Sequence, residues 1–316
     1  MTLYLAALRA DLAAHGPLVR VVIAGHAGSS PREAGAAMNV WAGGQSGTIG
    51  GGALEYAAAA RARRIGAPEV ERTALGPALG QCCGGAVTLV YEPIDAAWIA
   101  AREGGALARP VTRDAGTEMP LKLRRTIAGG RGGAGAVAHL LVAGWWLEPL
   151  AIPRHDLWIW GAGHVGRALV AVLAPLPDLA LTWADTGPAR FPDTIPPGVQ
   201  IKFAENPADL VTQALPHARH LVLTYSHAID LELCHRLLGH GFTSAGLIGS
   251  ATKWARFRSR LGALGRSPAQ IGRITCPIGD PSLGKHPQAI ALGVGAALLG
   301  DLRATSDQRT MGSSGS

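Results

Sequence analysis

Glycines in turns are the residues of this sequence whose types and spacing best suit chemistry. The segment GAGHVG at 161–166 follows an apolar stretch, LWIW at 157–160, and precedes an apolar helix-forming stretch. This context matches the G-x-G-x-x-G turn that binds nucleotide phosphates. Gly161 would permit the tight turn, Gly163 would let a pyrophosphate approach the backbone, and Gly166 would allow close packing of helix on sheet.

Charged and polar residues follow the turn at the ends of later predicted strands. Asp185 ends the next strand, 22 residues after Gly163, where an acid can accept hydrogen bonds from a ribose. His227 and Asp230 follow another strand, and Lys253 lies in the strand-to-helix turn of GLIGSATKWARF. Ligands of open α/β sheets bind at this carboxyl edge, so we expect these side chains, with His164 of the glycine turn, to contact a ligand.

Other interpretations of these residues stay open. His227, Asp230 and Cys234 have the chemistry of metal ligands but no diagnostic spacing. His164 could face solvent, Lys253 could belong to a solvated basic helix face, and the whole turn could serve packing alone.

The first half of the chain contains two more glycine-rich loops. GSSPREAGAAM at 28–38 offers the Ser29 hydroxyl and the Arg32 guanidinium, a good oxyanion ligand. GTIGGGALE at 47–55 supplies a run of backbone N–H donors, including those of Gly50 and Gly51, ahead of a helix. Two such loops favour an anion site, although each could be a tight structural turn.

Adjacent cysteines, Cys82 and Cys83, lie between glycines in GQCCGG at 80–85. A loop of this kind exposes thiols, and an exposed thiolate can bind a soft metal or accept sulfur. The alternative is two small packing residues. With only four cysteines in 316 residues, two of them adjacent, a disulfide framework is not expected, and cysteine should serve chemistry or packing.

Composition limits the class of protein. Hydrophobic residues make up 48% and charged residues 16%, which excludes disorder, and no apolar run is long enough to span a membrane. The N-terminal residues lack the pattern of a signal peptide, so a cytoplasmic location is expected. The net charge of +7 suits an anionic ligand, whereas scattered basic residues and 5% aromatic content disfavour nucleic acid.

The elements that must position these residues form two patterns. The first half has apolar strand-like runs at 18–25, 36–44 and 85–94 and a helix at 53–64, which indicate an N-terminal α+β domain over 1–152. From 153 to 306 strands alternate with helices, which predicts an α/β fold with a Rossmann-like, doubly wound parallel sheet. Residues 307–316 are expected to be a disordered tail or a remnant of cloning.

Taken in order, these motifs resemble those of the XdhC/CoxI family of molybdoenzyme maturation factors. The resemblance covers nearly the whole chain, and LGPALGQCCGG at 75–85 is most similar to the XdhC branch. Cys83 matches the cysteine of the CGG element of the family, Cys82 is the extra cysteine of this branch, and Gly161, Gly163 and Gly166 match the Rossmann turn. Trp254 departs from the pattern, because a basic residue is expected there.

The resemblance implies a carrier rather than an enzyme. Such a protein binds molybdenum cofactor (Mo-molybdopterin), protects it during sulfuration by a cysteine desulfurase, and inserts it into the xanthine dehydrogenase apoenzyme. The cofactor is an anionic pterin phosphate with a dithiolene-bound metal, so Cys83 is the candidate molybdenum contact. Homo-oligomerisation is compatible with this role.

Two hypotheses in which the protein is an enzyme compete with the carrier hypothesis. One is an NAD(P)-dependent oxidoreductase that uses the 161–166 turn to bind NAD(P) or another nucleotide, with a catalytic residue among His227, Asp230 and Lys253. The other is a persulfide relay in which Cys83 transfers sulfur to the cofactor.

Overall fold

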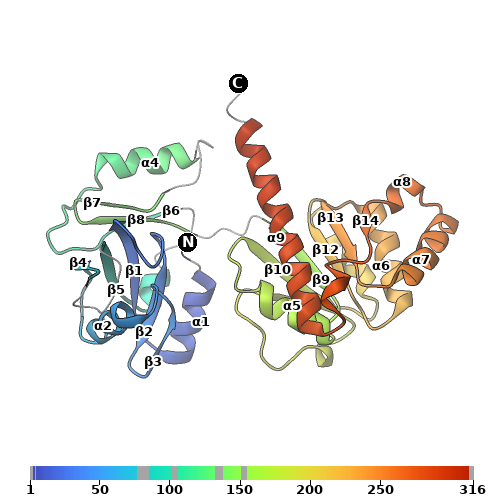
Figure 1. The fold of residues 1–316 in the computed structure, drawn as a ribbon, viewed down its shortest axis with the longest axis horizontal. Helices are drawn as coiled ribbons and strands as arrows, with labels where there is room; N and C mark the ends of the chain where they lie inside the picture. The colour runs from blue at the N-terminus through green and yellow to red at the C-terminus, as the bar shows by residue number, and fades with distance from the viewer. Residues whose placement is uncertain are drawn as a thin grey trace. The chain divides into compact units, whose positions relative to one another are not determined.

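The computed structural model describes residues 3, 5–76, 85–100, 106–131, 138–150 and 155–312 of the chain (Figure 1). The chain forms two compact units, Met1–Ile152 and Pro153–Ser316, called unit 1 and unit 2 below. Cys82 and Cys83 lie outside the described residues. Among the residues so described, every helix is too short or too polar to cross a lipid bilayer.

Unit 1 contains two antiparallel sheets. The larger has the strand order β3-β2-β1-β5-β4, and the smaller has the order β6-β8-β7. The elements in chain order are α1 (Leu5–His15), β1 (Leu18–Ala27), β2 (Ala37–Trp41), β3 (Gly44–Gly47), α2 (Gly52–Ala62), β4 (Glu69–Ala74), β5 (Ala86–Ile94), α3 (Ala96–Ala100), β6 (Ala106–Pro110), α4 (Leu121–Arg131), β7 (Leu140–Val142) and β8 (Trp145–Pro149).

Alternation of side chains along β1 gives the large sheet of unit 1 two buried faces. Val21 and Ile23 pack with the inner face of α2, including Leu54 and Ala58, in one hydrophobic cluster. Val22, on the other face, belongs to a second cluster with Trp146 of the small sheet and with other residues of both sheets. Because successive residues of a strand point to opposite faces, one apolar run supplies both layers.

Four buried charged residues, each on a different strand, connect the two sheets. Arg20 of β1 and Arg109 of β6 both bind Glu148 of β8, at 2.8 Å and 2.9 Å between nitrogen and carboxylate oxygen. Arg109 also donates from Nε to Oε1 of Glu92 on β5, at 2.7 Å. All four side chains are at most 5% exposed. Buried charges of this kind are tolerated only when they are paired, and these pairs join strands of the two sheets, so we call the four residues the charge network.

Unit 2 is a single parallel sheet with strand order β11-β10-β9-β12-β13-β14. Its elements are β9 (His155–Trp160), α5 (His164–Leu173), β10 (Leu179–Asp185), η2 (Pro188–Arg190), β11 (Gln200–Phe203), η3 (Pro207–Gln213), β12 (Arg219–Val222), α6 (His227–His240), β13 (Ser244–Leu247), α7 (Ala251–Ala263), α8 (Pro268–Ile271), β14 (Ile274–Thr275), η4 (Pro281–Leu283) and α9 (Pro287–Gly312).

Both faces of the unit 2 sheet are covered. Leu157 and Ile159 of β9 pack in a cluster with residues of α5 and α9, which lie side by side in Figure 1. Trp158 and Trp160 of the same strand point the other way, into a cluster with residues of α6 and α7. The α/β fold with a doubly wound parallel sheet and an N-terminal α+β unit is therefore confirmed.

Several elements differ from the sequence-based expectations. Strand β4, EVERTA, was missed because it is a polar edge strand whose Glu69 and Glu71 pair with Arg61 of α2. One of the helices expected from the alternating pattern, at 206–215, is instead the 3₁₀ helix η3, Pro207–Gln213. Helix α9 continues to Gly312, so residues 307–312, which were expected to form part of a tail, are helical.

The charge network makes a testable contribution to stability. Burial would raise the pKa of Glu148, but the charges of Arg20 and Arg109 outweigh it and lower the pKa to about 2. A carboxyl whose folded pKa is depressed stabilises the fold above its unfolded pKa near 4.5 and loses that contribution as pH falls toward 2. We therefore expect Glu148→Gln to cost about 3–5 kcal/mol at neutral pH and to flatten the acid dependence between pH 5 and pH 3.

Hydrogen exchange of amides in β1, β6 and β8 measures this effect within the whole chain. Glu118→Gln is the matched control, because Glu118 is exposed. Equal protection and parallel pH curves for wild type, Glu148→Gln and Glu118→Gln would contradict the assigned role.

Candidate functional site

The carboxyl edge of the unit 2 sheet brings three loops together. Strand β9 lies between β10 and β12, so the loops that follow these three strands are neighbours although they are distant in sequence. The direction of strand order changes at β9, which is where open α/β sheets bind ligands. The glycine turn at 161–166 leaves β9 at this point and leads directly into α5.

The three glycines of the turn have different surroundings. Gly161 has φ +123°, and a Cβ there would lie 2.4 Å from the carbonyl oxygen of Leu223. A Cβ on Gly166 would lie 2.0 Å from the carbonyl oxygen of Gly161, whereas a Cβ on Gly163 would meet nothing within 4 Å. The expected structural roles of Gly161 and Gly166 are thus met. The open face of Gly163 leaves room for a ligand, whose binding there stays a prediction.

Asp185 has a structural task at this edge. Its side chain is buried, and Oδ2 accepts a hydrogen bond from the backbone N–H of Ala162 at 2.5 Å. Oδ1 accepts from the backbone N–H of Thr186 at 2.6 Å and lies 3.5 Å from Nε of Arg190. The carboxylate therefore fixes the glycine turn against the end of β10. Contact with a ribose stays a prediction for this residue.

The N-terminus of α5 lacks the side-chain cap that the N-termini of α6 and α7 have. Ser226 caps α6 and Ser250 caps α7, each through its side-chain oxygen. The N-cap of α5 is Gly163, which offers no side chain, and the first turn of α5 contains no acid. The first N–H groups of a helix lack partners within the helix, and no side chain of the described residues caps those of α5, so they are suited to an anion.

Arg190 and Tyr225 form a stacked pair beside the glycine turn. The guanidinium carbon of Arg190 lies 4.6 Å from the centre of the Tyr225 ring, and Tyr225 is 65% exposed. Arg190 belongs to the segment after β10 and Tyr225 to the loop after β12, so the pair spans the position of β9. Sequence reasoning missed both residues. Exposed aromatic and guanidinium planes are suited to stacking with a flat heterocycle.

Asp230 and Lys253, which the sequence analysis singled out separately, are partners. Lys253 Nζ lies 2.6 Å from Oδ2 of Asp230, a fully buried carboxylate, and donates to the carbonyl oxygen of Ile248 at 2.9 Å. The other oxygen of Asp230 accepts from the backbone N–H and hydroxyl of Thr224. This pair joins the loop after β12 to the loop after β13. The ammonium also lies over the ring of Phe257, at 5.3 Å from its centre.

The other predicted residues of unit 2 are less closely connected. His164 is exposed at the start of α5, and His227 is exposed with its ring 6.4 Å from that of Phe257. Burial raises the pKa of Cys234 to about 12, so its thiol stays protonated. Within the described part of the chain, no three His, Cys, Asp or Glu side chains gather to hold a metal, so His227, Asp230 and Cys234 form no such site there.

Unit 1 also brings its loops together. A Cβ on Gly50 would lie 2.5 Å from Cβ of Pro31, so the 47–52 loop packs directly on the 28–38 loop. A Cβ on Gly85 would lie 2.2 Å from the carbonyl oxygen of Ser29, which places the end of the GQCCGG segment against the same loop. Arg32, in the 28–38 loop, forms an ion pair with Glu33 at 3.5 Å.

Three successive backbone N–H groups of the 47–52 loop, those of Ile49, Gly50 and Gly51, already have partners. Oε2 of Glu55 accepts from the N–H groups of Ile49 at 3.1 Å and Gly51 at 2.9 Å, and from the Thr48 hydroxyl. The N–H of Gly50 donates to the Thr48 hydroxyl. Although partial burial opposes it, these hydrogen bonds lower the pKa of Glu55, which keeps the carboxylate ionised. An external anion would have to displace Glu55 from the Gly51 N–H and the Thr48 hydroxyl from the Gly50 N–H.

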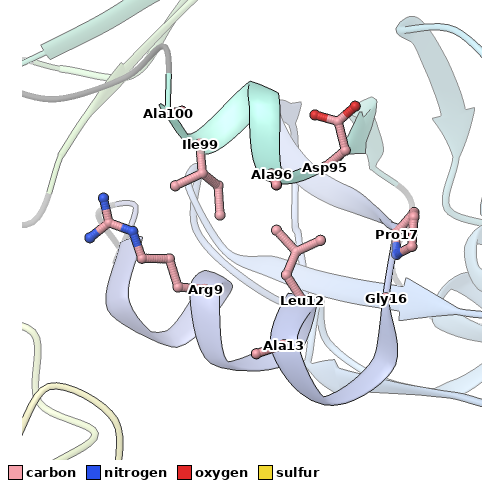
Figure 2. A pocket seen from close by; sticks show the side chains of 9 residues that line it. All are labelled: Arg9, Leu12, Ala13, Gly16, Pro17, Asp95, Ala96, Ile99 and Ala100. Carbon is pink, nitrogen blue, oxygen red and sulfur yellow. The ribbon is translucent and has the colours of Figure 1, made fainter.

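An apolar hollow of about 720 Å³ lies elsewhere in unit 1, between α1 and α3 (Figure 2). Leu12 and Ile99 line its base, and Arg9 and Asp95 lie at its ends. None of the predicted site residues lines it.

The space around the glycines predicts opposite outcomes for two alanine substitutions. Gly166→Ala should destabilise unit 2 by about 3 kcal/mol, because the added methyl overlaps the Gly161 carbonyl. Gly163→Ala should leave stability unchanged or slightly higher, because φ −75° suits alanine and nothing lies nearby. Chemical denaturation followed by far-ultraviolet circular dichroism measures both. Equal losses would contradict the packing described.

Solved structures resemble the chain to different extents. A Bacillus halodurans structure described as a xanthine dehydrogenase has a TM-score of 0.64 and 21% identity and covers 96% of both chains. A Rossmann-fold NAD(P)-binding family protein from Shigella flexneri has a TM-score of 0.28 and 16% identity, covering 35% of this chain and 63% of its own. A short-chain dehydrogenase/reductase from Veillonella parvula has a TM-score of 0.25 and 15% identity, covering 43% and 61%. Only the first of these likenesses extends over the whole fold.

Sequence families give a more specific assignment. No curated protein matches the chain. A model of the XdhC Rossmann domain matches residues 157–298, and a model of the XdhC and CoxI family matches residues 11–73. The two matches fall in different units and together span more than half of the sequence. The chain belongs to the XdhC and CoxI family.

Proposed function

We propose that this protein binds molybdenum cofactor and delivers its sulfurated form to the xanthine dehydrogenase apoenzyme. The observation that carries the proposal is the open turn of unit 2, where the uncapped start of α5 lies beside the stacked pair of Arg190 and Tyr225. Such a site suits a ligand that joins a phosphate to a flat heterocycle, and the pterin phosphate of molybdenum cofactor has both parts.

The described residues fit the organic part of this cofactor. The N–H groups at the start of α5 would hold the phosphate, with the open face of Gly163 allowing close approach. Tyr225 and Arg190 would stack with the pterin, and Lys253, which its ion pair with Asp230 holds at this edge, would contact a polar group of the ligand. When bound, the cofactor would supply a dithiolene-held molybdenum centre.

A soft metal contact calls for a thiolate, and the described thiols are unsuited to it. Cys234 is buried, and burial also raises the pKa of Cys276. Cys83 therefore remains our candidate for the metal contact, with Cys82 beside it in sequence. Gly85, two residues after Cys83, packs against the 28–38 loop, which contains Ser29 and Arg32. We place these first-half residues in the cofactor-handling function of unit 1.

The proposal has consequences for partners. Carrying the sulfurated form implies an encounter with a cysteine desulfurase as well as with the apoenzyme, and self-association is compatible with both. Sulfuration and insertion of this cofactor suit a cytoplasmic protein. Binding is the task, with chemistry left to the acceptor enzyme.

Loss of the stacking ring should reduce cofactor binding without unfolding the protein. We expect Tyr225→Ala, purified from molybdenum-replete cells, to retain about tenfold less pterin than wild type, because stacking on an aromatic ring contributes about 1–3 kcal/mol. Tyr56→Ala is the matched control, since Tyr56 is 81% exposed on α2 of unit 1. Pterin fluorescence after oxidation measures the content. If the purified protein binds NAD(P) tightly and contains no pterin, the carrier proposal is contradicted and an NAD(P)-dependent oxidoreductase is favoured.

Metal retention and transfer test the second half of the proposal. Cys83→Ala should keep pterin but lose most of its molybdenum, measured by elemental analysis. Wild-type protein loaded with sulfurated cofactor should restore activity to purified apo-xanthine dehydrogenase. If the loaded protein fails to activate an apoenzyme that free cofactor does activate, the delivery proposal is contradicted. Repeated transfer of sulfur from a Cys83 persulfide to the cofactor would favour the persulfide-relay enzyme instead.

A further inference from the structure

Helix α7 and the residues after it form a basic segment that contains no acid. Residues 251–276 contain six basic residues and no acid, and the formal charge of the whole chain is only +7. The six are Lys253, Arg256, Arg258, Arg260, Arg266 and Arg273. Three of them have internal contacts: Lys253 binds Asp230, Arg266 donates to the carbonyl oxygen of His235, and Arg273 donates to that of Phe242. The other three cations of this segment, Arg256, Arg258 and Arg260, all lie on α7 and are exposed.

Two of these arginines form a row on the outer surface of α7. Phe257 and Leu261 are buried and anchor the helix to unit 2, and residues four apart lie on one face of a helix. Arg256 and Arg260 are exposed at this spacing, and Leu264, four residues further on, is 51% exposed. Within the described residues, neither arginine makes an ion pair or a side-chain hydrogen bond. We call Arg256, Arg260 and Leu264 the α7 stripe.

An unpaired row of like charges disfavours the free helix, since cations one turn apart repel each other and no acid is close in sequence to relieve them. A surface with carboxylates placed opposite the two guanidinium groups would remove the repulsion and could bind each one through two hydrogen bonds. The exposed leucine at the end of the row adds an apolar contact. Together these features are suited to an acidic protein surface.

The chemistry of the stripe favours protein over nucleic acid or membrane. The three free cations of α7 are all arginine, a residue enriched at protein interfaces, where lysine is depleted. Single-stranded nucleic acid sites add exposed aromatic rings, and membrane-bound helices point aromatic residues outward. On α7, Phe257 is buried and Trp254 packs against the hydrophobic core of unit 2.

We propose that the α7 stripe is the docking surface for an acidic face of a partner protein. The identity of the partner rests on the proposed function, which makes it the apoenzyme that accepts the cofactor. The stripe would steer the carrier to its acceptor and hold it during transfer.

The test compares two charge reversals of equal size in the full-length protein. Arg256→Glu/Arg260→Glu alters the stripe, and Arg124→Glu/Arg125→Glu alters two exposed arginines of α4 in unit 1 by the same net charge. Binding to immobilised apo-xanthine dehydrogenase is measured from low to physiological salt. We expect the stripe variant to bind about tenfold more weakly, with a shallower salt dependence, and the control to match wild type.

The outcomes separate this inference from the proposed function. Equal binding by the two variants and wild type overturns docking through the stripe, even where pterin content and cofactor delivery are normal. Stripe-dependent binding by a protein that retains no pterin supports docking while cofactor carriage fails. Stripe-dependent binding to a DNA duplex or to anionic vesicles, without binding to the apoenzyme, overturns the inference in favour of that surface.

Discussion

The candidate ligand-binding edge of unit 2 depends on the close contact between Gly166 and the carbonyl of Gly161. With no side chain between them, α5 begins directly against the end of β9, and the buried carboxylate of Asp185 fixes the intervening Ala162 N–H. This arrangement directs the first N–H groups of α5, which no described side chain caps, toward the carboxyl edge of the sheet, beside the loops after β10 and β12. A side chain at either glycine would separate the helix from the strand.

The two glycine loops, at 47–52 and at 161–166, differ in whether a carboxylate of the protein binds their backbone N–H groups. In unit 1, the carboxylate of Glu55 accepts hydrogen bonds from the Ile49 and Gly51 amides, so the loop is satisfied internally. In unit 2, Gly163 supplies no cap and the first turn of α5 has no acid. A loop whose N–H groups already bind an internal carboxylate gains little from an added anion. The start of α5 has no such carboxylate, so it is the better suited of the two to an anionic ligand.

The sequence predicted those parts of the structure that depend on neighbours in the chain. The alternation of strands and helices in the second half and the packing roles of Gly161 and Gly166 follow from local pattern, and the structure agrees. The stacking of Arg190 on Tyr225 could not be predicted from the sequence, because it requires the segments after β10 and β12 to meet across β9. The same holds for Arg20 and Glu148, which are 128 residues apart. Glu55 follows the glycine loop directly in the sequence, but its position near the start of a helix does not predict which backbone N–H groups it binds.

The contrast between the two loops is tested most directly by amide hydrogen exchange with and without bound molybdenum cofactor. Our account predicts that cofactor slows exchange at residues 163–166 and in the loop around Tyr225, while the amides of Ile49 and Gly51, already bound to Glu55, change little. Slowed exchange at residues 49–51 with none at 163–166 would contradict it.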